Sequence, residues 1–222
     1  MKVAVPGYLP PLTYMAALVR EDTLYFRQDT QYQKQTHRNR AHIYGANGTL
    51  KLSIPIEHTP TQGYRMDRDV ALFNTTPWQN QHWKSLQAAY RSSPYFEFYE
   101  EELHPFFSQT FPRLFDFNVA LIEVLFKLMD VPKTIELLET PPANAEELSH
   151  HLNAKGTPYP TPEYIQVFAS KHDYIANLSC VDALFNMGPT TASYLLELEK
   201  NLSTKSTRLK WPDDRKVWVR GW

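Results

Sequence analysis

Basic and hydrogen-bonding side chains are crowded into one short segment, QYQKQTHRNRAHIYG, which spans residues 31–45. Its side chains with binding chemistry are Tyr32, Lys34, His37, Arg38, Asn39 and Arg40. A guanidinium group can hold a phosphate or carboxylate through two parallel hydrogen bonds, and an ammonium group adds a point charge. The segment also follows a predicted strand, and ligands of open α/β sheets gather beyond strand ends. It therefore indicates a site for an anionic ligand, such as a nucleotide sugar or a phosphopantetheine donor.

The same bases could instead stabilise the fold. Three cations so close in the chain repel one another unless anions offset them. Their partners could be Asp22, Asp29 or the acidic run 100–102, in which case the bases would brace the hairpin that follows. The ligand hypothesis predicts instead that the bases line an accessible cleft. The structural alternative predicts that they are buried against carboxylates.

Two residues outside this segment could move protons. His82 recurs with Trp78, Leu86 and Tyr90 at intervals of four, which places these residues along one face of a helix. A histidine titrates near neutral pH and can act as a general base, although a histidine on an apolar helix face is often a hydrogen-bonded core residue. Asp29 could orient such a histidine or accept a proton; otherwise it simply ends a strand.

Several common site motifs are absent from the sequence. There is no HExxH or CxxC pattern, and adjacent histidines such as His150 and His151 make a poor chelate, so no metal is predicted. GxGxxG, GxxxxGK[ST] and GxSxG are also missing, which argues against a Rossmann grip, a P-loop and a nucleophile elbow. Cys180 lies in an apolar helix entry and is interpreted as a buried structural thiol. We expect no cofactor.

Composition narrows the class of protein. The 222 residues carry a formal charge of −1, so no global field would recruit nucleic acid or an acidic membrane. A single cysteine rules out an intramolecular disulfide and is typical of a reducing cytosol. Prolines interrupt the apolar N-terminal stretch, and no uncharged apolar run approaches the length of a membrane span. We expect a soluble, cytoplasmic protein without a membrane span or a nucleic-acid partner.

The order of elements predicts an α/β fold. A strand at 2–6, a helix within 10–22 and a strand at 23–28 suggest a parallel β-α-β start. Alternating residues around Asn47-Gly48 predict a β-hairpin over 40–57, with that dipeptide supplying the positive φ angles of the turn. Further helices are expected over 78–93, 94–107 and 111–131, and a further strand over 134–139. The fold class is thus a mixed sheet with a β-hairpin, followed by a helical C-terminal half.

The pattern also suggests a division of the chain. Residues 1–139 are predicted to form an α/β core domain, and residues 140–162 a proline-rich loop or lid. Residues 163–200 read as a helical module packed on that core. Residues 201–222 form a tail with three tryptophans and several bases.

Five blocks of the sequence, in this order, together resemble the WbqC-like family of bacterial proteins in its Bacteroidetes form. They are GYLPPLTYMAALVRED, QYQKQTHRNRAHIYGANGTLKLSIPIE, HWKSLQAAYRSSPYFEFY, LFDFNVALI and NLSCVDALFNMGP, and they span most of residues 3–197. The resemblance carries over Tyr32, Lys34, Arg38, Asn39, Arg40, Trp78, His82 and Tyr90. Val5, Arg27 and His37 depart from the family's usual residues.

The resemblance implies a cytoplasmic role in surface-polysaccharide (O-antigen-type) biosynthesis, with acyl or aminoacyl transfer to an activated amino sugar. His82 and Asp29 are then the catalytic candidates, and Tyr32, Lys34, Arg38, Asn39, Arg40, Trp78 and Tyr90 are the substrate-binding candidates. The expected partner is an anionic small molecule, either a sugar nucleotide or an acyl thioester, and a homo-oligomer is left open. The alternative is a non-catalytic scaffold or binding protein of the same pathway, presenting its aromatic residues to a partner.

Overall fold

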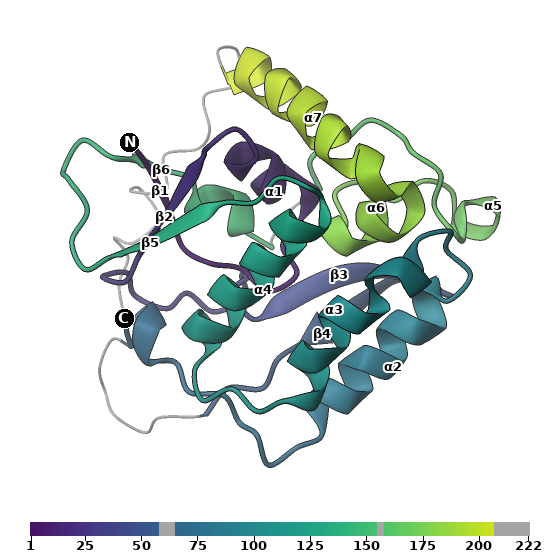
Figure 1. The fold of residues 1–222 in the computed structure, drawn as a ribbon, viewed down its shortest axis with the longest axis horizontal. Coiled ribbons are helices and arrows are strands. Elements are labelled where there is room, and N and C mark those ends of the chain that lie inside the picture. Colours follow the sequence, from purple (N-terminus) through teal and green to yellow (C-terminus); the bar gives the residue numbers. More distant parts are fainter. Residues whose placement is uncertain (58–64, 155–157, 207–222) are drawn as a thin grey trace, which may run out of the picture.

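Four short strands form a parallel sheet at one end of the molecule (Figure 1). The computed structural model describes residues 1–57, 65–154 and 158–206. The strands are β1 (Lys2–Ala4), β2 (Thr23–Arg27), β5 (Thr134–Leu138) and β6 (Glu146–Glu147), in the order β5-β2-β1-β6. All three pairings between them are parallel. The two central strands, β1 and β2, supply most of the sheet's buried side chains.

The predicted β-α-β start is confirmed. Helix α1 (Leu12–Leu18) connects β1 to β2, and these two strands are hydrogen-bonded neighbours with Val3 opposite Tyr25. Every residue of α1 is buried, because α6 and α7 cover it from the C-terminal part of the chain. The helix thus lies in the middle of the core rather than on a solvated face.

The predicted hairpin is confirmed as β3 (Arg40–Gly45) and β4 (Gly48–Ser53). The hairpin forms a separate two-stranded sheet, whereas the sequence predicted that it would belong to one mixed sheet with the parallel strands. The turn prediction was wrong by one residue. Gly45 pairs with Gly48, so Ala46 and Asn47 are the two loop residues, and only Gly48 has a positive φ, of 96°. The turn therefore places its glycine after the loop, where the left-handed conformation costs glycine little.

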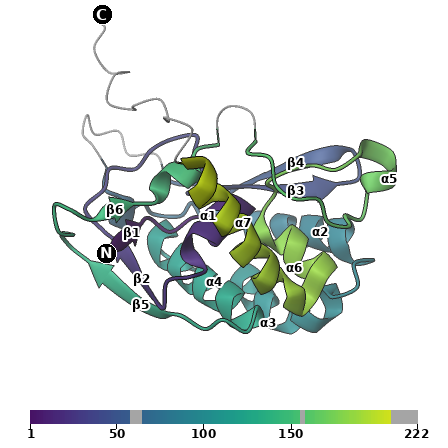
Figure 2. The same cartoon turned by 90° about the horizontal axis from the view of Figure 1, so that it is seen from above.

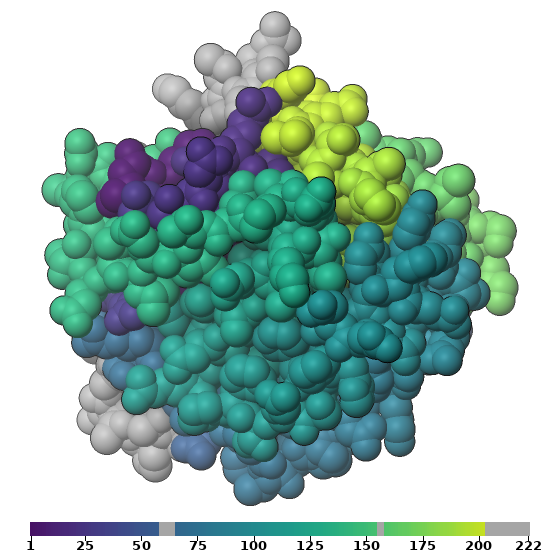
Figure 3. All heavy atoms as spheres, in the orientation of Figure 1, coloured from purple at the N-terminus to yellow at the C-terminus, as the bar shows by residue number. Residues whose placement is uncertain are grey.

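Three helices follow the hairpin and confirm the expected order. They are α2 (Trp78–Tyr90), α3 (Phe96–Ser108) and α4 (Leu114–Leu128). Figure 1 shows α4 crossing the middle of the molecule, and Figure 3 shows that α3 and α4 cover the centre of this face. In α4, Phe115, Phe117, Leu121 and Leu125 are buried, whereas Val124 and Leu128 are partly buried against the core.

The C-terminal part of the chain is helical, as predicted. Its helices are α5 (Ala169–His172), α6 (Cys180–Met187) and α7 (Thr191–Ser206), with the 3₁₀ turn η3 (Gly188–Thr190) between α6 and α7. Two other 3₁₀ turns, η1 (Asp67–Asp69) and η2 (Ser149–Leu152), come earlier in the chain. Strand β6 and η2 lie within residues 140–162, so part of that stretch belongs to the parallel sheet. The division into core, lid and module stays a prediction, and most of the predicted tail lies outside the described residues.

No helix in the described ranges combines the length and the apolar character that crossing a membrane requires.

Candidate functional site

The basic segment is divided between the interior and the surface. Arg38 is only 4% exposed, and its Nε lies 3.0 Å from Asp67 Oδ1 and 3.2 Å from Oδ2. Its Nη1 also donates to Gln33 Oε1 and to Thr36 Oγ1, each at 3.4 Å. The expectation that Arg38 lines an accessible cleft is therefore wrong. Asp67, itself 4% exposed, neutralises it within the protein.

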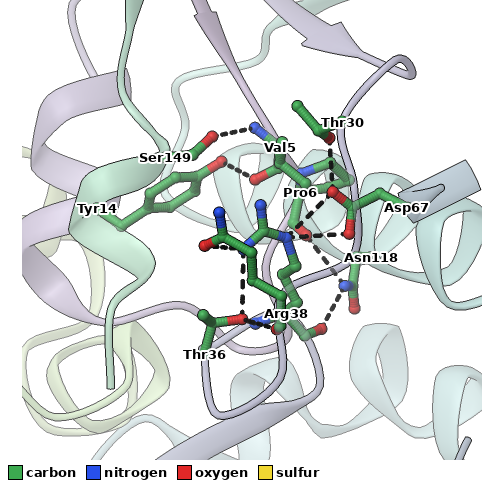
Figure 4. Close-up of polar contacts among 10 residues, drawn as sticks. Val5, Pro6, Tyr14, Thr30, Thr36, Arg38, Asp67, Asn118 and Ser149 are labelled. Atoms are coloured by element: carbon green, nitrogen blue, oxygen red, sulfur yellow. Dashed lines mark hydrogen bonds and ion pairs between the residues drawn. The ribbon is translucent and has the colours of Figure 1, made fainter. Parts of the chain in front are cut away.

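Figure 4 shows how the buried pair is held. Thr30 Oγ1 donates to Asp67 Oδ2 at 2.5 Å, and Asn118 Nδ2 donates to the backbone oxygens of Pro6 and Arg38 at 3.1 and 2.7 Å. Pro6 and Thr30 come just after β1 and β2, so the network lies beyond the carboxyl ends of the central strands. This is the edge at which ligands collect in open α/β sheets.

Burial and pairing act against each other on the carboxyl group of Asp67. Burial raises its pKa, while Arg38 and the hydroxyl of Thr30 act to lower it. Tyr14 lies close to the same network and donates to the backbone oxygen of Val5 at 2.6 Å. Burial raises the pKa of Tyr14 well above its ordinary value. These groups form a buried, hydrogen-bonded network at the sheet edge.

Tyr32 marks the part of the cluster that faces outward. It is half-buried, and burial raises its pKa to about 12, with Asp67 adding to the rise and Arg38, Arg40 and Arg65 opposing it. Three guanidinium groups are thus within electrostatic reach of one phenol. Lys34 is exposed on the same loop. Arg40, Arg65 and Lys34 are thus the bases near Tyr32 that the predicted anion site could use, and that site stays a prediction.

The outward bases have no carboxylate partner among the described residues. In the described part of the chain, no carboxylate lies within ion-pairing distance of Lys34, Arg40 or Arg65. Within the described ranges, the Arg65 side chain donates to the backbone oxygens of Glu57 and Asp69. Asp67 and three guanidinium groups affect the pKa of Tyr32, and Asp67 is paired with Arg38. Arg40 and Arg65 are therefore left without a carboxylate partner in the part of the chain that the structure describes. An anion at this surface would offset them.

Asn39 fixes the base of the hairpin. Its Nδ2 donates to the backbone oxygen of Ile54 at 2.9 Å, and its own backbone oxygen accepts from the Ile54 amide at 2.8 Å. Its Oδ1 is buried and has no hydrogen-bond partner among the described residues. Its contacts are those of a residue that positions Arg38 and Arg40 on either side of it.

His82 lies in the core, beneath the hairpin. It is 6% exposed, its Nδ1 is 2.8 Å from the hydroxyl oxygen of Tyr8, and its ring lies edge-on to Trp78. Burial lowers the pKa of His82 to about 4, against a raising effect of a hydrogen bond to the Ser53 backbone. Trp78 is also buried, at 2% exposed. The pair therefore packs the underside of the hairpin, as expected for a hydrogen-bonded core histidine.

Asp29 is engaged by a neighbouring arginine. Arg27 Nε and Nη2 donate to its two carboxylate oxygens at 2.7 and 2.9 Å, and Arg27 Nη1 donates to Glu147 at 2.9 Å. These hydrogen bonds lower the pKa of Asp29. The arrangement links the ends of β2 and β6, and it shows why an arginine at position 27 suits this chain. His82 has no described contact with Asp29.

Tyr90 belongs to a buried network that the sequence did not reveal. Its hydroxyl donates to Asp182 Oδ1 at 2.8 Å and accepts from the backbone amide of Tyr44 at 3.0 Å. Gln166 donates to Asp182 Oδ2 at 2.9 Å, and the hydroxyl of Tyr164 donates to the same oxygen. Asp182 is fully buried, and burial raises its pKa. The network joins β3 and α2 to the C-terminal residues and lies apart from Tyr32.

Residues 1–57, 65–154 and 158–206 contain no group of three or more His, Cys, Asp or Glu side chains that could hold a metal ion. Cys180 is buried, in agreement with the structural interpretation, and burial raises the pKa of its thiol to about 12.

Comparison with known proteins agrees with the resemblance seen in the sequence. The model of the WbqC-like protein family matches residues 6–155, which include the basic segment, Asp67 and His82. No curated protein and no solved structure matches the chain. The family match covers more than half of the chain and includes the outward bases around Tyr32. The chain belongs to the WbqC-like protein family.

Proposed function

We propose that this protein binds an anionic activated sugar in a cytoplasmic step of surface-polysaccharide (O-antigen-type) biosynthesis and modifies an amino sugar by acyl or aminoacyl transfer. Membership of the WbqC-like family suggests a polysaccharide-related role. One observation carries the proposal further. Arg40 and Arg65 both lower the pKa of Tyr32, and neither has a carboxylate partner in the described part of the chain.

The ligand's phosphate would complete the charges around Tyr32. A guanidinium group and a phosphate form charge-assisted, bidentate hydrogen bonds, which is the chemistry that nucleotide-linked sugars offer. Arg38 would then act beneath the ligand: its pairing with Asp67 holds the loop from which Tyr32 and Lys34 project. In this proposal, Arg40, Arg65, Tyr32 and the exposed Lys34 contact the substrate, and the buried network fixes their positions.

The catalytic roles of His82 and Asp29 stay predictions. His82 is neutral down to about pH 4 and is therefore unprotonated at neutral pH, as a base must be. However, its Nδ1 lies at the Tyr8 hydroxyl, and its ring is buried beneath the hairpin. Transfer chemistry at His82 would require the substrate to displace part of that packing.

The burial of His82 and the pairing of Asp29 with Arg27 favour a second candidate. In it, the protein binds the same anionic ligand without reacting, as a scaffold or binding protein of the same pathway. The two candidates share the ligand site and differ only in the chemistry that follows binding.

One experiment separates the candidates. The protein is titrated calorimetrically with UDP-, GDP- and dTDP-linked amino sugars. It is then incubated with each sugar nucleotide and an acyl-CoA, and the products are identified by mass spectrometry. Binding with an acylated sugar supports the transferase. Binding without any product across all donors supports the binding protein. No binding of any sugar nucleotide contradicts both.

A further inference from the structure

The outer face of the β3–β4 hairpin carries a second group of bases. In the antiparallel register Arg40 faces Ser53 and His42 faces Lys51, so these four side chains share one face of the hairpin. The opposite face carries Ala41, Ile43 and Leu52, which are buried in the core. Figure 2 shows the hairpin along one surface of the molecule with α2 beneath it.

The members of this group influence one another electrostatically. Burial lowers the pKa of His42, and Lys51 and Arg40 lower it further. The ring of His37 lies edge-on to His42, with centroids 5.1 Å apart, and has its own pKa lowered to about 4, chiefly by burial. Lys51 is exposed, and no carboxylate in the described residues pairs with it or with Arg40. Arg40 and Lys51 thus flank the partly buried His42 imidazole on one face of the hairpin.

The spacing on this face suits two linked anionic groups. Side chains directly opposite on an antiparallel pair lie about 5 Å apart at Cβ, and diagonal neighbours about 7–8 Å. Arg40 and Lys51 are diagonal neighbours, with His42 and Ser53 completing the square. Two long basic side chains at this separation can converge on adjacent phosphoryl groups, and the imidazole and hydroxyl can donate hydrogen bonds between them.

We propose that Arg40, His42 and Lys51 form a diphosphate subsite on the outer face of the hairpin. The proposal rests on the proposed function for the identity of the ligand. Arg40 is shared with the site at Tyr32, so a bound diphosphate extends from Tyr32 onto the hairpin. Nucleotide-linked sugars and coenzyme A thioesters both carry a diphosphate, and this common group is what the subsite recognises.

A lysine on an edge strand has a simpler role, since it discourages pairing with other chains. That role requires neither Arg40 nor His42 on the same face, and it predicts no preference between anions. The two explanations therefore differ in the anion selectivity of the intact protein.

The test uses the full chain and measures the affinities of inorganic phosphate, pyrophosphate, UDP and coenzyme A by calorimetry. Pyrophosphate should bind at least about tenfold more tightly than phosphate, and Lys51→Ala should abolish this preference. Lys84→Ala, which removes an exposed lysine from α2, serves as the matched control and should preserve it. The His42 imidazole, followed by NMR, should titrate at a higher pH when pyrophosphate offsets Arg40 and Lys51. Equal affinity for the two anions, or an unchanged preference in Lys51→Ala, overturns the subsite.

The ligand arms separate this proposal from the proposed function. Tighter binding of UDP than of coenzyme A, with both weakened by Lys51→Ala, supports the subsite and a sugar-nucleotide source for its diphosphate; the reverse order supports the subsite with a thioester source. Pyrophosphate binding that depends on Lys51, without binding of any sugar nucleotide, supports the subsite and contradicts the proposed function. Sugar-nucleotide binding that depends on Arg40 but not on Lys51 overturns the subsite and leaves the proposed function standing.

Discussion

Replacing Asp67 by asparagine tests the buried ion pair. Arg38 and Asp67 are each 4% exposed, and the guanidinium Nε lies 3.0 Å from the carboxylate. The substitution keeps the size of the side chain but leaves a cation buried without its counter-charge. Breaking such a pair typically costs about 3–5 kcal/mol. Because asparagine can still accept from Thr30, we expect Asp67→Asn to lower the free energy of unfolding by about 3 kcal/mol.

Urea unfolding followed by tryptophan fluorescence measures this loss. Asp69→Asn is the matched control: the Asp69 side chain is 58% exposed and lies 4.0 Å from Arg68, so its removal should cost less than about 0.5 kcal/mol. The double variant Arg38→Met/Asp67→Leu removes both buried charges. It should recover most of the lost free energy of unfolding, because no charged group then has to be removed from water when the protein folds. If Asp67→Asn costs no more than the control, the Arg38–Asp67 pair is not desolvated, and the buried network does not support the proposed ligand site.

Three further substitutions test other parts of the structure. Leu125→Ala should cost about 2–5 kcal/mol in urea unfolding because Leu125 is fully buried, and an unchanged midpoint would show that α4 is peripheral. The pKa of His82 is about 4 in the folded protein and about 6.5 in the unfolded chain. The contribution of neutral His82 to folding stability is therefore present above pH 6.5 and is lost as the pH falls toward 4. Wild type should lose about 2 kcal/mol between pH 7 and pH 5 from this group; His82→Asn should lack that loss, and identical pH profiles would contradict the burial of the imidazole. Tyr90→Phe leaves Asp182 and the Tyr44 amide each short of a partner and should cost about 1–3 kcal/mol, whereas a neutral effect would mean that water replaces the hydroxyl.

Local signals in the sequence account for the elements that could be predicted. The spacing of apolar residues in α4 and the alternation around Gly48 depend on neighbours within a few positions, which a single sequence displays. Strand β6 could not be predicted from the sequence, because Glu146 and Glu147 show no alternation of apolar residues. These two residues form a strand by pairing with the free edge of β1. The separation of the hairpin from the parallel sheet is equally non-local. The amide of Ser179 donates to the His42 carbonyl and covers the outer edge of β3.

For the same reason, the sequence located only some residues of the candidate site. Clustering in sequence located the bases around Tyr32, but the partner of Arg38 comes from 29 residues further along, through the bridge that pairs Gln31 with Met66. His82 was placed on the correct helix face, yet Tyr8, which lies 74 residues away, determines its environment. No spacing rule connects such residues, because the tertiary fold alone brings them together.

The most direct test of the central claim is the affinity of the Arg40→Ala variant for a nucleotide-linked amino sugar that wild type binds, measured calorimetrically at physiological salt. Arg91→Ala is the control, since Arg91 forms an exposed pair with Glu100 on the helices. We predict that Arg40→Ala weakens binding by about 1.5–3 kcal/mol, the range for a hydrogen bond to a charged group, while Arg91→Ala leaves it unchanged. Equal affinity of Arg40→Ala and wild type would contradict the claim that the uncompensated bases around Tyr32 hold the ligand.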